Sequence, residues 1–136
     1  MPSFQISLVC PNALVFYGEA EQVDLPGAEG EMGVLAGHAP IVSALRPGIV
    51  KVIADGRNET FVVMGGFAEF SGEELTILAD AADRVEDFDV AGLKDIIEQH
   101  EQNLSTMTLG EELDREIALL DRYKTLHRYL TVTTAL

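Results

Sequence analysis

The spacing of apolar residues along the chain changes its period once, near residue 87. Before that point, from residue 3 to about residue 83, apolar and polar residues alternate in short runs such as FQISLV at residues 4–9. A period of two places successive side chains on opposite faces of a β-strand. Glycines separate these runs, and Asp55-Gly56 is typical of a two-residue hairpin turn. We therefore predict an antiparallel β-sandwich or barrel over residues 1–86.

Beyond this point apolar residues recur every three or four positions, which indicates one face of an α-helix. Asp87 or Asp89 can cap a first helix, and Thr108 and Glu111 have the spacing of a capping box before a second. We predict an antiparallel helical hairpin over residues 87–136. The positions expected on its inner stripes are Leu93, Ile96, Ile97, His100 and Leu104 in the first helix, and Leu113, Ile117, Leu120, Tyr123, Leu126 and Leu130 in the second.

Glycine is concentrated in the segment PGAEGEMGVLAGHAP, residues 26–40. A phosphate-binding loop needs a lysine after its glycines, or a G-x-G-x-x-G pattern that opens a helix, and this segment has neither. Glu29 and Glu31 would also repel an anion. We interpret the glycines as positions of tight turns within the β structure. Gly65-Gly66 likewise predicts a turn or a bulge in a later strand.

Composition narrows the class of protein. The chain has 136 residues, 47% of them hydrophobic, which allows one domain with its own core and a small appendage. A net charge of −14 argues against nucleic acid and against anionic lipid headgroups as partners. No segment approaches the roughly 18 apolar residues of a membrane-spanning helix, and we see no secretory signal or transit peptide. We expect a soluble, cytoplasmic chain without direct membrane insertion. Its single cysteine, Cys10, excludes an internal disulfide.

No group of residues indicates catalysis, a metal ion or a cofactor. His38, His100 and His127 do not have the spacing of zinc ligands, and neither G-x-S-x-G nor H-E-x-x-H occurs. The adjacent carboxylates Glu73-Glu74 and Glu111-Glu112 are expected to be solvated at turns or at a helix start. The residues alone leave two alternatives open. One is a free-standing adaptor domain that grips a partner with the hairpin, and the other is a small enzyme whose carboxylates act as acid and base.

Two long segments, PGAEGEMGVLAGHAPIVSALRPGIV and FVVMGGFAEFSGEELTILAD, resemble the epsilon subunit of bacterial F-type ATP synthases. The order of the motifs and the change to two C-terminal helices match that family across nearly the whole chain. The resemblance implies a β-sandwich of about ten strands followed by a helical hairpin. It also implies a non-catalytic subunit in the central stalk of a proton-translocating complex, with the gamma subunit and the membrane rotor ring as partners. Such a subunit would be peripheral, at the cytoplasmic face of a bacterial inner membrane.

The resemblance also suggests which residues contact partners. Glu29, Glu31 and His38 lie in the glycine-rich rim, which is expected to meet the rotor ring. The last helix can reach the catalytic alpha and beta subunits in an extended state, where basic residues face an acidic segment. The corresponding cations here are Arg115, Arg122, Lys124 and Arg128, of which the last three lie in the purely basic final turns. Because most charges earlier in that helix are acidic, we expect only weak inhibition of ATP hydrolysis.

Some members of the family bind ATP through an [IL]-D-x-x-R-A motif at the first helix. The aligned residues here are FDVAGL at 88–93, in which Asp89 is kept but Gly92 stands in place of the arginine. Since the arginine fork is the natural partner of phosphate oxygens, we expect this chain to sense ATP weakly.

Overall fold

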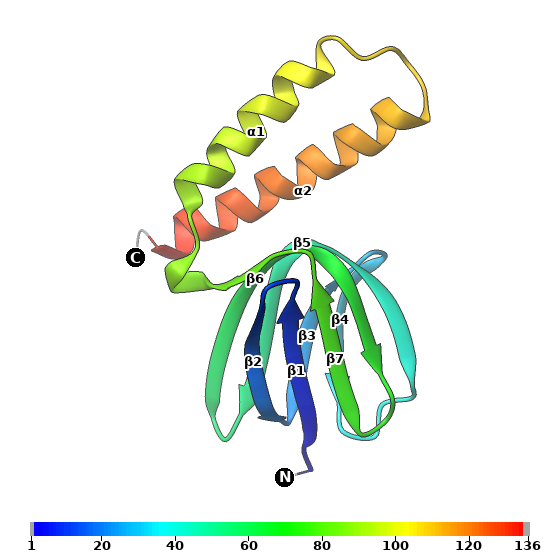
Figure 1. Ribbon diagram of the computed structural model, residues 1–136, viewed down its shortest axis with the longest axis vertical. Helices are drawn as coiled ribbons and strands as arrows, with labels where there is room; N and C mark the ends of the chain where they lie inside the picture. The colour runs from blue at the N-terminus through cyan, green and yellow to red at the C-terminus, as the bar shows by residue number, and fades with distance from the viewer. Residues whose placement is uncertain (1, 135–136) are drawn as a thin grey trace. The chain divides into compact units, whose positions relative to one another are not determined.

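The computed structural model describes residues 2–134, and the chain forms two compact units that divide between Asp87 and Phe88. The first unit is a curved β structure and the second is a pair of helices (Figure 1). Within the described residues the first unit has eight strands and a short 3-10 helix, Val85–Asp87. The strands are β1 (Phe4–Cys10), β2 (Ala13–Ala20), β3 (Gln22–Gly27), β4 (Gly30–Leu35), β5 (Ile41–Ala54), β6 (Arg57–Phe70), β7 (Glu74–Ala79) and β8 (Ala82–Arg84).

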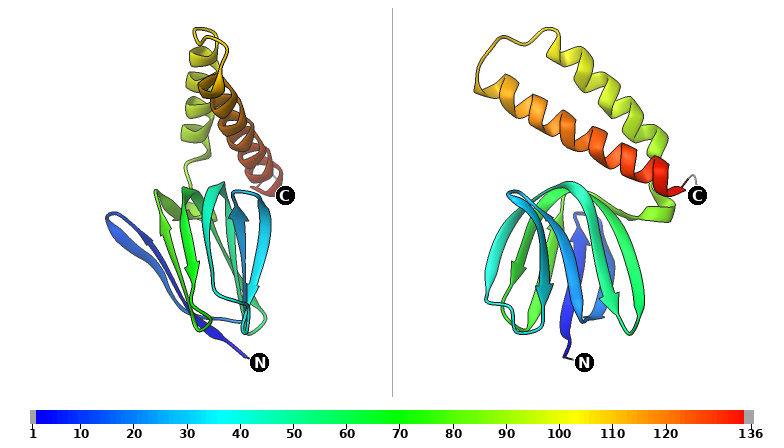
Figure 2. Two further views of the ribbon diagram at one scale, coloured as in Figure 1. Left: turned by 90° about the vertical axis from the view of Figure 1, so that its right-hand side faces the viewer. Right: turned by 180° about the vertical axis from the view of Figure 1, so that it is seen from behind.

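The strands form one sheet in the order β2-β1-β7-β6-β5-β3-β4, with β8 also paired to β6, and the sheet folds over into two layers (Figure 2). We call one the β1 layer; it contains β2, β1, β7, the second half of β6 and the first half of β5. The β3 layer contains β8, the other halves of β5 and β6, β3 and β4. Alternate side chains of both layers fill the core between them, including Ile6, Leu8, Val23, Phe61 and Ile77.

The predicted sandwich followed by two helices is confirmed, but it has eight strands rather than about ten. The difference arises because β5 and β6, 14 residues each, run unbroken through both layers. Counting their halves separately would add two to the eight and give ten. The turn or bulge expected at Gly65-Gly66 is also absent, since β6 continues through both glycines and keeps one register with β5. Both glycines have positive φ, +109° and +134°, and β6 passes from one layer to the other at this point.

The hairpin between β5 and β6 turns at Asp55-Gly56, as predicted. Both residues have positive φ, 49° and 73°, the combination that a two-residue type I′ turn requires. The backbone N–H of Asp55 donates to the Glu21 carboxylate, 2.7 Å away, which anchors the turn to the chain segment that leads into β3.

The second unit consists of α1 (Val90–Leu104) and α2 (Glu111–Thr134). Asp89 caps α1 as expected, because its carboxylate accepts from the Gly92 N–H at 2.9 Å. The predicted capping box is wrong. Helix α2 begins at Glu111, and the carbonyl of Gly110 accepts the first helical hydrogen bond, from the Asp114 N–H. The cap therefore lies two residues beyond Thr108. No helix within residues 2–134 combines the length and hydrophobicity needed to cross a membrane.

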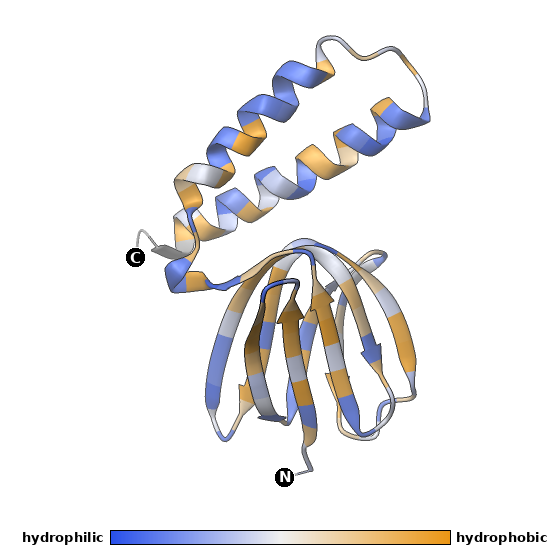
Figure 3. Ribbon diagram, in the orientation of Figure 1, coloured by the Kyte–Doolittle hydropathy of each residue, from blue (hydrophilic) through white to orange (hydrophobic). Residues whose placement is uncertain are grey.

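The seam between α1 and α2 follows the predicted stripes at most positions, with Leu93, Ile97, Leu120, Leu126 and Leu130 buried. Apolar and polar residues alternate along both helices accordingly (Figure 3). Two predicted members do not fit, because Ile117 is 49% exposed and Ile96 is 37% exposed. Glu116 is the more buried neighbour of Ile117. Steps of three and of four residues both fit a helical period, so the sequence spacing did not distinguish these two positions.

Candidate functional site

The glycine-rich rim folds mainly as a hairpin rather than as a loop. Strands β3 and β4 pair up to Gly27 and Gly30, so Ala28 and Glu29 alone form the turn. Gly27 is required here, because a Cβ on it would lie 2.7 Å from the Gly30 carbonyl oxygen. Glu29 and Glu31 are both exposed. The predicted acidic contact residues thus lie together at the tip of one hairpin.

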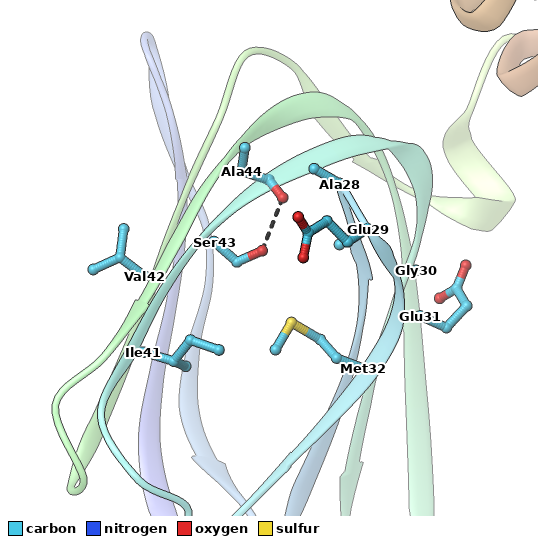
Figure 4. Close-up of a pocket in the computed structure, with 10 residues that line it drawn as sticks. Ala28, Glu29, Gly30, Glu31, Met32, Ile41, Val42, Ser43 and Ala44 are labelled. Atoms are coloured by element: carbon cyan, nitrogen blue, oxygen red, sulfur yellow. Dashed lines mark hydrogen bonds between the residues drawn. The ribbon is translucent and has the colours of Figure 1, made fainter.

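A groove separates this hairpin from the start of β5 and has a volume of about 560 Å³. Met32, Ile41 and Ser43 point toward the groove, whereas Glu31 and Val42 point away from it (Figure 4). One backbone hydrogen bond, from the Ala28 N–H to the Ala44 carbonyl at 2.8 Å, closes the end of the groove near the turn. Its lining offers no group of side chains suited to catalysis, and its rim is acidic.

His38 lies away from these two glutamates. The backbone N–H of His38 donates to the Leu35 carbonyl at 3.0 Å, and the ring atom Nδ1 lies 2.6 Å from the Ala39 carbonyl oxygen. The imidazole ring contacts the Phe70 ring edge-on, with 6.2 Å between the centroids. Glu29 precedes β4 and His38 follows it, and a six-residue strand is roughly 17–20 Å long. The structure therefore does not bring the acidic tip and His38 into one site.

Two of the four candidate cations on α2 share a surface. Lys124 forms an ion pair with Glu101 of α1, at 3.2 Å, and lines with Arg128 a groove of about 340 Å³ between the helices. Arg122 does not line this groove. It precedes Lys124 by two residues, which is a rotation of about 200° around a helix. Lys124 and Arg128 therefore form one basic edge, and Arg122 belongs to another side of α2.

An exposed apolar surface of the β unit was not found from the sequence. It is the outer face of the β1 layer, where Phe67 lies opposite Leu78, Leu78 opposite Val9, and Val9 opposite Leu14. Exposure of the three largest side chains in this row is 56–61%. Val42 and Tyr17, 70% and 62% exposed, belong to the next row of the same face. The sequence could have indicated this face through strands in which apolar residues occupy inward and outward positions alike, as in LTILA at residues 75–79.

The described residues contain no group of three or more His, Cys, Asp or Glu side chains arranged to hold a metal ion. The structure thus offers exposed contact surfaces, and the comparisons with known proteins indicate what kind of protein carries them.

The family described as "ATP synthase, Delta/Epsilon chain, beta-sandwich domain" matches residues 3–85. The chain belongs to the ATP synthase epsilon-chain family. It is 52% identical to "ATP synthase epsilon chain 2" of Nitrobacter hamburgensis, over 99% of each chain. It is 47% identical to the "ATP synthase epsilon chain" of Afipia carboxidovorans, over 98% of each.

Solved structures show the same fold. A chain of the Euglena gracilis mitochondrial ATP synthase, in the OSCP/F1/c-ring assembly, matches with a TM-score of 0.75 at 24% identity, covering 94% of this chain and 81% of that one. A chain of the Tetrahymena thermophila central stalk and c-ring matches with a TM-score of 0.60 at 15% identity, covering 96% of each. The epsilon chain is a non-catalytic subunit of ATP synthase, so family membership favours that function over a free-standing adaptor or a small enzyme.

Proposed function

We propose that this epsilon-family chain is a rotor subunit of a proton-translocating F-type ATP synthase, in which the β unit joins the gamma subunit to the membrane rotor ring. In this arrangement the subunit is peripheral, at the cytoplasmic face of the inner membrane. The observation that carries the proposal is the outer face of the β1 layer. An apolar row that crosses four strands on a chain of net charge −14 is typical of a surface covered by a protein partner.

We assign the gamma subunit to this outer face. Aromatic residues such as Phe67 and Tyr17 are enriched at protein interfaces, and Leu78 adds apolar area beside Phe67. His38 is assigned to the same partner, because it lies near the start of β5, the strand that also carries Val42. Gamma should therefore bury the apolar row and extend to the end of β4 that carries His38.

The rotor ring is assigned to the acidic tip, Glu29 and Glu31. The tip is separated from His38 by the length of β4, and so the two ends of this strand can meet different partners. An exposed carboxylate pair suits a contact with basic or polar side chains, and such contacts favour correct orientation more than high affinity. In this assignment the two ends of the β unit contact different partners, gamma at one end and the rotor ring at the other.

The helical hairpin is assigned a modest regulatory role through the alpha and beta subunits. Lys124 and Arg128 form the basic edge that would face an acidic segment. Lys124 already has a partner in Glu101 within the hairpin, which reduces what a new acidic partner would gain. Exposed pairs of this kind contribute about 0–1 kcal/mol each. The hairpin should bias ATP hydrolysis without arresting it.

The assignment of gamma is tested with full-length chains carrying both Phe67→Ser and Leu78→Ser. Removing two central apolar contacts should weaken binding to purified gamma at least about tenfold, while circular dichroism shows an intact sandwich. The matched control is Ile117→Ser, which removes a similarly exposed aliphatic side chain (49%) from α2, outside the β unit, and should leave gamma affinity unchanged. Unchanged affinity in the double variant would disprove the assignment.

A further inference from the structure

The seam of the helical hairpin contains a polar layer. His100 of α1 contacts Glu116 of α2 through Nδ1 and the carboxylate oxygen Oε1, and its ring lies 5.4 Å from that of Tyr123. The side chains of His100 and Glu116 are only 24% and 20% exposed, whereas buried Ile97 precedes His100 on the same helix by one turn. A histidine and a carboxylate thus occupy positions that apolar residues occupy elsewhere along the seam.

From this geometry we propose that the His100–Glu116 contact makes closure of the hairpin depend on pH. Imidazole is the side-chain group that gains and loses a proton between about pH 5 and 8. When it is protonated, the contact is an ion pair between an imidazolium and a carboxylate. When it is neutral, the contact is at most an ordinary hydrogen bond, which is weaker.

The sign of the effect follows from where the carboxylate lies. Glu116 is beside His100 only while α1 and α2 are paired, so the extra attraction on protonation stabilises the paired state and not the separated one. Lower pH therefore favours the closed hairpin, and higher pH favours separation of the helices. Because both side chains keep some contact with water, the effect is moderate.

Other charged and titratable groups lie near this contact on both helices. Tyr123 faces His100 from α2. Glu101, next to His100 on α1, is paired with Lys124. Of these groups only His100 carries an imidazole. The pH dependence of closure is consequently assigned to the His100–Glu116 pair.

Closure can be measured on the isolated full-length chain. Cys10→Ser removes the native thiol, and Gln99→Cys on α1 with Ala118→Cys on α2 places a fluorescent donor and acceptor at exposed positions of the two helices. Single-molecule energy transfer then gives the ratio of closed to open hairpins. This ratio should be about threefold higher at pH 6 than at pH 8, in the range that a partly exposed ion pair contributes.

Two variants and one control identify the groups responsible. Glu116→Gln keeps the shape of the side chain but removes its charge, and His100→Gln removes the imidazole; each should abolish the pH dependence. His127→Gln changes another half-buried histidine of the same hairpin, outside this contact, and should leave the dependence as it is. A ratio that does not change with pH in the unmodified pair, or that still changes in both Glu116→Gln and His100→Gln, would overturn the proposal.

The dependence of closure on pH needs no other subunit, whereas an effect on ATP hydrolysis rests on the function proposed above. If pH fails to move the hairpin while Phe67→Ser with Leu78→Ser still weakens gamma binding, only the switch is rejected. If the hairpin responds to pH but Phe67→Ser with Leu78→Ser leaves gamma affinity unchanged, the switch stands and the assignment of gamma is rejected.

Discussion

Gly66 of β6 lies so close to Leu78 of β7 that a Cβ on the glycine would overlap the leucine's carbonyl oxygen. The glycine has a φ of +134°, a conformation that other residues rarely adopt. This close approach occurs where β6 passes from the β3 layer to the β1 layer, one position before Phe67 of the outer face. The same backbone feature therefore supports both the sandwich and the surface assigned to gamma.

Gly66→Ala should destabilise the β unit strongly. The added methyl group meets backbone rather than a flexible side chain, and its φ is strained, so we expect a loss of about 3 kcal/mol or more in the free energy of unfolding. Denaturant unfolding followed by circular dichroism measures it. Gly72→Ala is the control, because Gly72 also has positive φ (+106°) but faces open space, and its loss should be about 1 kcal/mol. If Gly66→Ala and Gly72→Ala lowered the free energy of unfolding equally, the close approach to Leu78 would not be the reason that Gly66 is needed.

Glu31→Ala and His38→Ala should affect different steps. Because Glu31 is at the start of β4 and His38 follows its other end, we expect Glu31→Ala to weaken the coupling of ATP hydrolysis to proton movement, and His38→Ala to weaken gamma binding. Proton pumping in membrane vesicles and gamma affinity are the two measurements. In the double variant the two effects should add, as they do for distant sites. Normal coupling in the double variant would contradict the assignment of the rotor ring.

The isolated chain should bind ATP no more tightly than about millimolar. Asp89 is already used as the cap of α1, and Gly92 supplies a backbone N–H to it rather than a guanidinium to phosphate. Without that fork, charge-assisted pairing with phosphate oxygens is lost at this position. Titration calorimetry gives the affinity directly, and a micromolar value would refute the prediction.

Removal of residues 88–136 should leave gamma binding intact and raise ATP hydrolysis only modestly. The first half of α2 carries Glu111, Glu112 and Asp114 in its first turn, which an acidic partner would repel, and only its final turns, from Arg122 on, are purely basic. ATPase activity of the reconstituted complex, with full-length and shortened chains, should differ by less than tenfold, or about 1.4 kcal/mol. A larger rise would show that the hairpin inhibits strongly, and loss of gamma binding would show that the β unit is not the docking unit.

Features that depend on a few neighbouring residues could be predicted from the sequence. Asp55-Gly56 forms its turn and Asp89 forms its cap because each needs only local backbone geometry. Thr108 failed as a cap because glycine is also an acceptable N-cap residue, so that Gly110 competes with it, and the sequence does not show which residue ends the loop. The resemblance to a known family, rather than periodicity, supplied the candidate contacts.

Features that depend on which strands become neighbours could not be predicted. Phe67 and Leu78 are 11 residues apart, and only the register of β6 with β7 makes them one surface. Likewise, Glu116 faces His100 because of how α2 is rotated, which a spacing of three or four residues leaves open. The separation of Glu31 from His38 needed the knowledge that the intervening residues form an extended strand.

The continuity of β5 and β6 through both layers has a mechanical consequence. The ladder between them extends without interruption of register from the pair Ile41–Phe70 to the pair Ala54–Arg57. For one layer to slide over the other, these two strands would have to stretch, or the hydrogen bonds between them would have to break together. The two continuous strands therefore make the sandwich resistant to shear between its layers. Torque applied at one end of the sandwich would reach the other end with little internal slip, which is the property that the proposed place between gamma and the rotor ring would require.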